Sequence, residues 1–254
     1  ERLGIFDMVW MLLFLAICCF ISALVQRLSG FGLATLLMAL LPIFMNFTDA
    51  LVITGVVGCV GSVALAIQQR RYIQWKKLAI PVAAYVVVGF FVTRLVAANA
   101  AADFKRWLGL FLFALALYFI LLSKRIHIKG SVPSGLLVGA ISGVGNNLFN
   151  VGGPPMAVYL LNVCDSNLAY LATMQVFLAI ISGYTNIVRA ASGMFYIGIL
   201  PMVPAAVIGM ALGFLVGGRI FHKLDGEKLK TVVYVVVAAS GLWIFFGDLL
   251  GFAV

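Results

Sequence analysis

The sequence predicts an all-α protein that crosses a membrane several times. Hydrophobic residues make up 64% of the 254 residues and charged residues only 10%, with a mean hydropathy of +1.17. A soluble domain is about 45–50% apolar and about 25% charged. The apolar residues form long runs instead of the alternating segments of a membrane β-barrel. Two Gly-rich interruptions of these runs further indicate a chain built from two related halves.

Seven apolar segments are near the ~20 residues that a transmembrane helix requires. They cover residues 6–26, 50–69, 78–98, 106–122, 167–188, 197–218 and 229–247. Shorter apolar pieces flank the interruptions, at 31–45, 132–143 and 153–163. The first segment contains Asp7 and has no basic stretch before it. We therefore expect it to be a retained span and not a signal peptide.

The longer interruption lies just past the middle of the chain, from Ser142 to Pro155, and contains Gly, Asn and Pro residues that should break a helix. A helix break at membrane depth is tolerated only where protein buries it or where it lines a watery cavity. A similar element, Ser29-Gly-Phe-Gly32 followed by Pro42, lies 113 residues earlier in the chain. Two copies of one interrupted helix are typical of transporters with internal repeats.

Further matches extend the repeat and suggest how the two copies face. Thr54 matches Thr173 at an offset of 119, while Pro81 and Gly89 match Pro201 and Gly209 at 120. We predict repeats at residues 1–126 and 130–254, each with about five membrane segments. An odd number of membrane segments in each repeat inverts the second repeat relative to the first and places 12 of the 17 Lys and Arg residues on one side of the membrane. A total of eight spans would instead split these residues 9 to 7 and leave Arg27 unassigned. The positive-inside rule thus favours inverted repeats, with both termini outside the cytoplasm and broken or re-entrant helices at the repeat interface.

The interrupted elements resemble those of the sulfite exporter TauE/SafE family. Gly143-Val-Gly145 and the run Val151–Leu161, with its Gly-Gly-Pro-Pro start, fit the second-half element of that family. The first half is a looser match, with Gly30–Thr35 in place of a glycine triplet and Pro42 retained; the basic loop Arg70–Tyr72 is also similar. The resemblance implies export of sulfur oxyanions such as sulfite, and of small organosulfonates such as sulfoacetate, across the bacterial inner membrane.

The polar residues of the interruptions suit a compact anion with several oxygen acceptors. Backbone N–H groups at the starts of half-helices favour negative charge, Pro154-Pro155 can begin such a half-helix, and Asn and Ser add side-chain donors. The candidate substrate-binding residues are Arg27, Ser29, Gly30, Gly32, Thr54, Ser142, Gly143, Gly145, Asn146, Asn147, Asn150, Gly152, Gly153, Pro154, Thr173 and Gln175. The glycines would equally fit a tight helix crossing, and the Thr hydroxyls could bond their own helices.

The charged residues bear on the transport mechanism. Arg27 either snorkels to the cytoplasmic surface or guards the anion entrance, whereas interfacial snorkelling is the favoured interpretation of Arg94 and Arg189. All eight acidic residues fall at the termini or at segment ends, and both His lie in basic loops. Carriers coupled to protons or sodium usually place such groups deep in the bundle. We therefore expect alternating access without a carboxylate relay, driven by the membrane potential.

The alternative function classes are a selective anion channel, a scaffold and an intramembrane hydrolase. A selective anion channel could be lined by the same broken helices, and a scaffold that transports nothing is a third possibility. An intramembrane hydrolase would need a base beside Ser142, and neither His127 nor His222 lies in a span, so we expect no enzyme. The basic residues lie mostly in short loops, which argues against nucleic acid. The four Cys form no metal or redox motif, so no cofactor or metal is expected. The expected partners are a small anion, the lipid bilayer and, as one possibility, a second copy of the chain in a homodimer.

Overall fold

The computed structural model describes residues 5–98, 104–121, 130–199, 201–220 and 226–249, and every regular element in these ranges is helical. The helices are α1 (Ile5–Ser29), α2 (Leu33–Leu40), α3 (Phe47–Gln68), α4 (Trp75–Ala98), α5 (Phe104–Leu121), α6 (Val132–Phe149), α7 (Gly153–Val163), α8 (Asn167–Ala191), α9 (Met202–Ile220) and α10 (Gly226–Leu249), with short 3-10 turns at Leu41–Ile43, Arg70–Tyr72 and Ile197–Ile199. Both histidines, the end of the predicted first repeat at residue 126, and Arg2, Lys124, Arg125, Lys129 and Lys223 of the charge count lie outside the described residues.

Five of the described helices are long and apolar enough to cross a membrane. They are α1, α3, α4, α8 and α9, whose apolar stretches are 18 to 25 residues long. A helix of this length rises about 27–38 Å, which matches the ~30 Å hydrocarbon core of a bilayer. The prediction of an all-α, multi-pass membrane protein is therefore confirmed.

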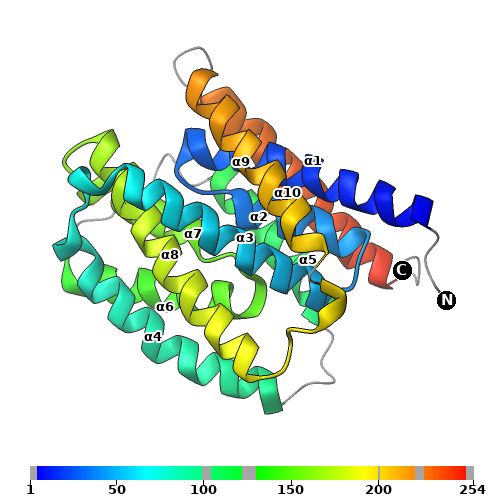
Figure 1. Cartoon of the computed structure of the whole chain (residues 1–254). Coiled ribbons are helices and arrows are strands. Elements are labelled where there is room, and N and C mark those ends of the chain that lie inside the picture. Colours follow the sequence, from blue (N-terminus) through cyan, green and yellow to red (C-terminus); the bar gives the residue numbers. More distant parts are fainter. Residues whose placement is uncertain (1–4, 99–103, 122–129, 200, 221–225, 250–254) are drawn as a thin grey trace.

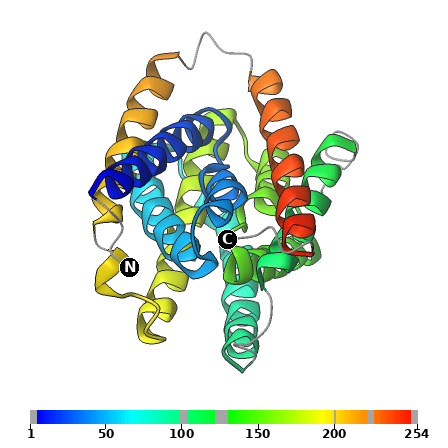
Figure 2. The same cartoon turned by 90° about the vertical axis from the view of Figure 1, so that its right-hand side faces the viewer.

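Helices from the first and second halves of the chain pack together in pairs. α1 runs along α9, α4 along α6, α3 along α8 and α5 along α10. Figure 1 shows α4 and α6 on one side of the molecule and α1 and α9 on the other, with α3 and α8 between them, and Figure 2 gives the view from the side. The first helix of each half thus packs on the fourth helix of the other half.

Small residues allow two of these helix pairs to approach closely. α6 presents Gly139 to α4, and a methyl group there would collide with the carbonyl oxygen of Pro81. α9 presents Gly209 to α1, and a methyl group there would collide with the carbonyl oxygen of Ala16. Membrane helices associate through such small residues because burying apolar surface is little incentive in lipid.

Two short helices follow breaks in the chain. α1 ends at Ser29 and α2 begins at Leu33, while α6 ends at Phe149 and α7 begins at Gly153. Gly30 (φ 84°) and Asn150 (φ 58°) follow these helix ends in left-handed conformations, which Gly and Asn adopt most readily. At 1.5 Å per residue, α2 is about 12 Å long and α7 about 16 Å, roughly half the thickness of the hydrocarbon core.

The structure corrects the predicted position of the second break. The observed break at 150–152 lies within the predicted interruption from Ser142 to Pro155, but α6 runs through Ser142 and Gly145 and stops only at Phe149, so the predicted end of the short piece at 143 is wrong. Glycine is tolerated inside this helix because Gly143 faces α4, where an added Cβ would lie 3.2 Å from the Tyr85 carbonyl oxygen. The breaks at 30–32 and 150–152 are therefore 120 residues apart, the offset seen elsewhere in the repeat, and not 113.

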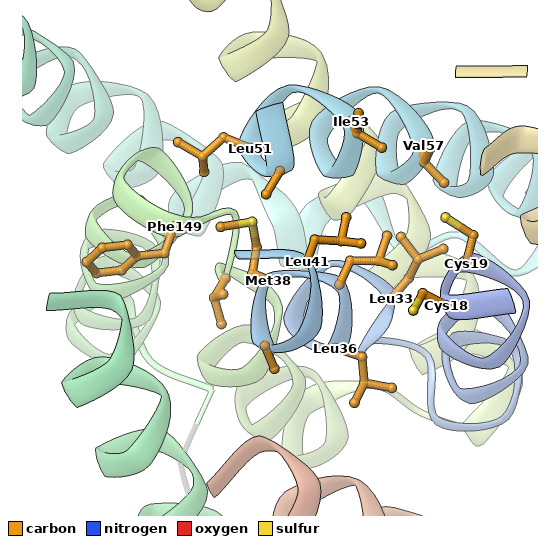
Figure 3. Packing of buried hydrophobic residues seen from close by; sticks show 14 of the residues in the cluster. Cys18, Cys19, Leu33, Leu36, Met38, Leu41, Leu51, Ile53, Val57 and Phe149 are labelled. Atoms are coloured by element: carbon orange, nitrogen blue, oxygen red, sulfur yellow. The ribbon is translucent and has the colours of Figure 1, made fainter. Parts of the chain in front are cut away.

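Protein surrounds the first short helix. Leu33, Leu36 and Met38 of α2 are buried against apolar residues of α1, α3 and α6, as Figure 3 shows. Cys18 and Cys19 of α1 belong to this core as small apolar fillers, and a second core surrounds α7 and the middle of α8. Burial of this kind is what an interrupted membrane helix requires.

Candidate functional site

The two breaks lie against each other near the middle of α8. A Cβ built on Gly153 would lie 3.3 Å from the Cβ of Phe31, and its next neighbours are the side chains of Met174 and Leu178 of α8. The meeting point is therefore apolar. The polar side chains gather instead in two clusters, one toward each end of α8.

The first cluster surrounds a buried arginine in the last turn of α8. Arg189 is only 6% exposed, and its Nη1 donates to Asn150 Oδ1 at 2.7 Å and to the Leu51 carbonyl oxygen at 3.3 Å. Asn150 Nδ2 donates to the same carbonyl at 2.7 Å. The predicted snorkelling of Arg189 to the interface is wrong, because these two acceptors from α3 and the second break hold the guanidinium inside the protein.

The charge of Arg189 has no acidic partner in the described part of the chain. Its two hydrogen-bond acceptors there are neutral, and Nη2 is buried with no hydrogen-bond partner in these residues. Buried charges in proteins are normally paired or fully hydrogen-bonded. An unneutralised guanidinium with a vacant donor is a suitable partner for an oxyanion.

Arg189 lines a cavity of about 400 Å³. The other lining residues are polar (Thr48, Thr93, Asn147, Thr185 and Ser192) or apolar (Phe47, Leu51, Phe104, Leu148, Val188 and Met194). A neighbouring hollow of about 560 Å³ shares Phe47 and Thr48 and adds Asp49, Lys105 and Tyr196. The cavity thus combines a cation, amide and hydroxyl groups with an apolar wall.

The neighbouring hollow also contains an acidic residue, at the start of α3. Tyr196 donates a hydrogen bond to Asp49 Oδ2 at 3.0 Å. Burial raises the pKa of the Tyr196 phenol, and the Asp49 carboxylate raises it further. A phenol is protonated at neutral pH even at its ordinary pKa of about 10, and the upward shift extends the pH range over which Tyr196 donates to Asp49.

A tyrosine from α4 holds two of the predicted asparagines. Tyr85 is fully buried, and its hydroxyl accepts hydrogen bonds from Asn146 Nδ2 at 2.8 Å and Asn147 Nδ2 at 3.2 Å. Thr93 Oγ1 donates to Asn147 Oδ1 at 3.3 Å. These contacts fix the Asn147 amide at the cavity wall.

The second cluster lies toward the start of α8 and is composed of neutral groups. Gln26 Nε2 donates to Gln175 Oε1 at 2.8 Å and to Ser62 Oγ at 3.3 Å, while Gln175 Nε2 donates to the Gly30 carbonyl oxygen at 2.8 Å. Tyr170 closes the same break by donating to the Ser29 carbonyl oxygen at 2.8 Å. Gln175 and Arg189 are 14 positions apart on one helix, so the clusters are separated by about 21 Å.

The predicted site residues are distributed over both clusters. Asn147 lines the cavity. Asn150 accepts a hydrogen bond from Arg189, which also lines the cavity, and Asn146 donates to the Tyr85 hydroxyl. Ser29, Gly30 and Gln175 lie in the second cluster, Thr173 Oγ1 nearby accepts a hydrogen bond from the Gln74 N–H, and Arg27 Nη1 donates to Gln68 Oε1. Gly32, Gly152, Gly153 and Pro154 form the breaks and the first turn of α7, and no side chain caps α2 or α7.

The remaining predicted residues are buried. Thr54 and Ser142 have hydroxyl groups without a hydrogen-bond partner in the described residues, and Gly143 and Gly145 pack against α4, α5 and the second break. Among the described residues, no group of three or more His, Cys, Asp or Glu could hold a metal ion.

Comparison with known proteins gives one match. The family model described as Sulfite exporter TauE/SafE matches residues 15–244. No curated protein and no solved structure matches the chain. The matched region extends from Leu15 in α1 to Ile244 in α10 and includes both breaks and the Arg189 cavity.

Proposed function

The chain belongs to the sulfite exporter TauE/SafE family, and from this premise we propose that it exports sulfite or a small organosulfonate such as sulfoacetate. The family is one of membrane transporters for sulfite or similar anions, not of enzymes. The observation that carries the assignment to a site is the buried Arg189, which lines a cavity of about 400 Å³ without a described acidic partner. In this proposal, the anion binds in that cavity.

The chemistry of the cavity supports this proposal. A cation at membrane depth costs at least about 2.5–3.5 kcal/mol, and an anion would offset that cost by occupying the vacant Nη2 donor. A sulfonate or sulfite oxygen can accept charge-assisted hydrogen bonds from a guanidinium. Thr93, Thr185 and Ser192 add hydroxyl groups to the same cavity, while the phenylalanines would contact an organic substituent.

The architecture that we propose consists of inverted repeats, residues 1–126 and 130–254, with α2 and α7 as re-entrant helices. The exchanged pairing of α1 with α9 and of α6 with α4 supports a two-fold relation between the halves. The basic loop that includes Arg70 and Arg71 lies toward the start of α8, since the Gln74 N–H bonds Thr173 there. By the positive-inside rule, the Arg189 end of the molecule then faces away from the cytoplasm, across what we take to be the bacterial inner membrane.

The difference between the two ends of α8 favours a carrier over a channel. A cavity lies beside Arg189, whereas hydrogen-bonded side chains fill the Gln26 and Gln175 cluster. A carrier exposes its site to one side at a time, while a conducting channel needs a continuous path. With export of an anion favoured by about 2.3 kcal/mol per charge per 100 mV, a uniporter would need no proton relay.

The test is ³⁵S-sulfite uptake into proteoliposomes that contain the purified protein. We expect uptake without a pH gradient, and we expect Arg189→Gln to lower it at least tenfold, because a hydrogen bond to a charged group contributes about 1.5–3 kcal/mol. Arg189→Lys should retain part of the uptake, and the exposed Arg94→Gln is the matched control. Wild-type uptake in Arg189→Gln would contradict the site. A strict requirement for a pH gradient would contradict uniport, and single-channel currents would identify a channel.

A further inference from the structure

The offset of 120 residues pairs positions that carry the same chemistry in the two halves. It matches Ser22 with Ser142, and both have fully buried hydroxyls without a partner among the described residues. It also matches Gln26 with Asn146, two buried amides that lie one helical turn before a break. Because the offset comes from the helix breaks themselves, these matches are independent support for the equivalence.

At two further pairs of positions related by this offset, one half has an arginine and the other half has an amide side chain. Asn147, on the cavity wall, corresponds to Arg27 in the last turn of α1. Arg189 corresponds to Gln69, at the C-terminal end of α3. Each end of the molecule therefore has one guanidinium and one amide at these positions. At one end the guanidinium is on α1 and the amide follows α3, whereas at the other end the amide is on α6 and the guanidinium is on α8.

The surroundings of Arg27 resemble those of Arg189 in two respects. Arg27 Nη1 donates to Gln68 Oε1 at 2.7 Å, as Arg189 Nη1 donates to Asn150 Oδ1 at 2.7 Å. In both cases the acceptor is a neutral amide oxygen and not a carboxylate. Gln69, like Arg189, has a buried side-chain atom without a hydrogen-bond partner in the described residues, but this Oε1 is an acceptor, so only the Nε2 group of Gln69 could donate to an anion.

We infer that Arg27, with the amides of Gln68 and Gln69, forms a second binding site for the same anion, which is connected to the central cavity only when the protein faces the cytoplasm. This inference rests on the proposed function and on the proposed inverted repeats. When inverted repeats exchange conformations, the closed end takes the arrangement of the open end. During export the anion then binds first at Arg27 and leaves from Arg189.

In this proposal, the second cluster blocks the path between the Arg27 site and the Arg189 cavity in this conformation, while Arg27 itself is half-exposed. Gln26, the residue beside Arg27, is bonded to Gln175 and Ser62, which ties α1 to α8 and α3. Arg27 itself lies against α9, where a Cβ on Gly218 would be 3.6 Å from its Nε and Nη2 atoms. Separating α1 and α3 from α8 would break the Gln26–Gln175 bond and open a path from the half-exposed guanidinium toward the cavity.

The experiment measures sulfite/sulfite exchange separately from each face, in inside-out and right-side-out membrane vesicles. We expect Arg27→Gln to raise the apparent KM for ³⁵S-sulfite at least tenfold at the cytoplasmic face and less than twofold at the outer face. Arg189→Gln should show the opposite pattern, and Gln69→Ala should raise the cytoplasmic KM about threefold. Arg27→Lys should recover part of the affinity, and the exposed Arg71→Gln is the matched control.

The outcomes separate this inference from the proposed function. Wild-type vesicles without sulfite exchange would remove both. Exchange that is impaired by Arg189→Gln but unchanged in Arg27→Gln, or impaired equally at both faces by Arg27→Gln, would remove only the second site. A thermal melt of each purified variant checks folding, and if Arg27→Gln does not fold, the Gln69→Ala result decides the question.

Discussion

The two helix breaks both begin with a residue in a left-handed conformation, but different side chains satisfy their backbone groups. At the first break Gly30 has no side chain, so Gln175 of α8 supplies the amide that binds its carbonyl oxygen. At the second break Asn150 supplies its own amide to α3, and α8 contributes Arg189. One break is thus held by neutral groups and the other by a cation.

This difference indicates which end can bind a ligand. The amides of Gln26 and Gln175 donate and accept among themselves and pack closely, which is the stable arrangement for buried neutral groups. A guanidinium that has a vacant buried donor and no described counter-ion is less completely satisfied. The cavity lies beside the less satisfied group, where an anion would gain the most.

The largest effect on stability is expected when the cation loses its main acceptor. Asn150→Ala leaves Arg189 with the Leu51 carbonyl oxygen at 3.3 Å as its described acceptor. Loss of a hydrogen bond to a charged group costs about 1.5–3 kcal/mol, and Ala in the left-handed conformation of Asn150 costs about 1 kcal/mol more. Thermal unfolding in detergent measures this loss. The matched control is Asn162→Ala, because within the described residues Asn162 donates to a carbonyl of its own helix. An Asn150→Ala variant with the melting temperature of the wild type would contradict the prediction.

A second substitution at the same position separates stability from binding. Asn150→Asp keeps an acceptor for Arg189 and adds a counter-charge. We expect it to melt no lower than the wild type but to lose at least tenfold in sulfite uptake, because an internal carboxylate would compete with the anion. Uptake at the wild-type rate would show that the charge of Arg189 is not used for binding.

The sequence was sufficient for the class of protein and for the family, but not for the site. Hydropathy predicted the spans, and the Gly-Gly-Pro-Pro motif led to a family resemblance that the match over residues 15–244 confirms. The Ser-Gly-x-Gly strings at 29–32 and 142–145 look alike, yet only the first breaks a helix. The reason lies in tertiary packing, since Gly143 is needed for close contact with α4.

Arg189 shows the same limit for a functional residue. Its position near a helix end favours snorkelling, and the acceptors that bury it belong to residues 138 and 39 positions away in the chain. Tyr85 is similar, because its partners Asn146 and Asn147 are about 60 positions away. One signal was available in both cases: a polar side chain within a segment that is otherwise apolar.

The next largest effect tests the close approach of α6 to α4 and of α9 to α1. Gly139→Ala and Gly209→Ala should each cost about 2–3 kcal/mol, because each methyl group meets a backbone carbonyl oxygen that cannot easily move. Gly183→Ala is the matched control, since its Cβ would meet nothing within 4 Å and Ala favours a helix by up to about 1 kcal/mol. Wild-type thermal stability of Gly139→Ala and Gly209→Ala in detergent would contradict the close contact of these helix pairs.

The smallest effect is expected in the neutral cluster. Gln175→Ala removes the donor to the Gly30 carbonyl oxygen and leaves the Gln26 amide with Ser62 Oγ at 3.3 Å. Leaving such groups unsatisfied costs about 1–2 kcal/mol, less than the loss of a partner for the buried cation. Because the cluster closes its end of α8, the substitution should also open that end more often.

Labelling of a cysteine at position 62 measures this opening. In a chain whose four native Cys are replaced by Ala, Ser62→Cys should react several-fold faster with a membrane-impermeant maleimide from the cytoplasmic side once Gln175→Ala is added. Gln74→Ala is the control, because the Gln74 side chain bonds Asp165 outside the cluster. An unchanged labelling rate would mean that Gln175 only stabilises the first break, and closure of the cytoplasmic end would then have to come from packing between α1 and α9.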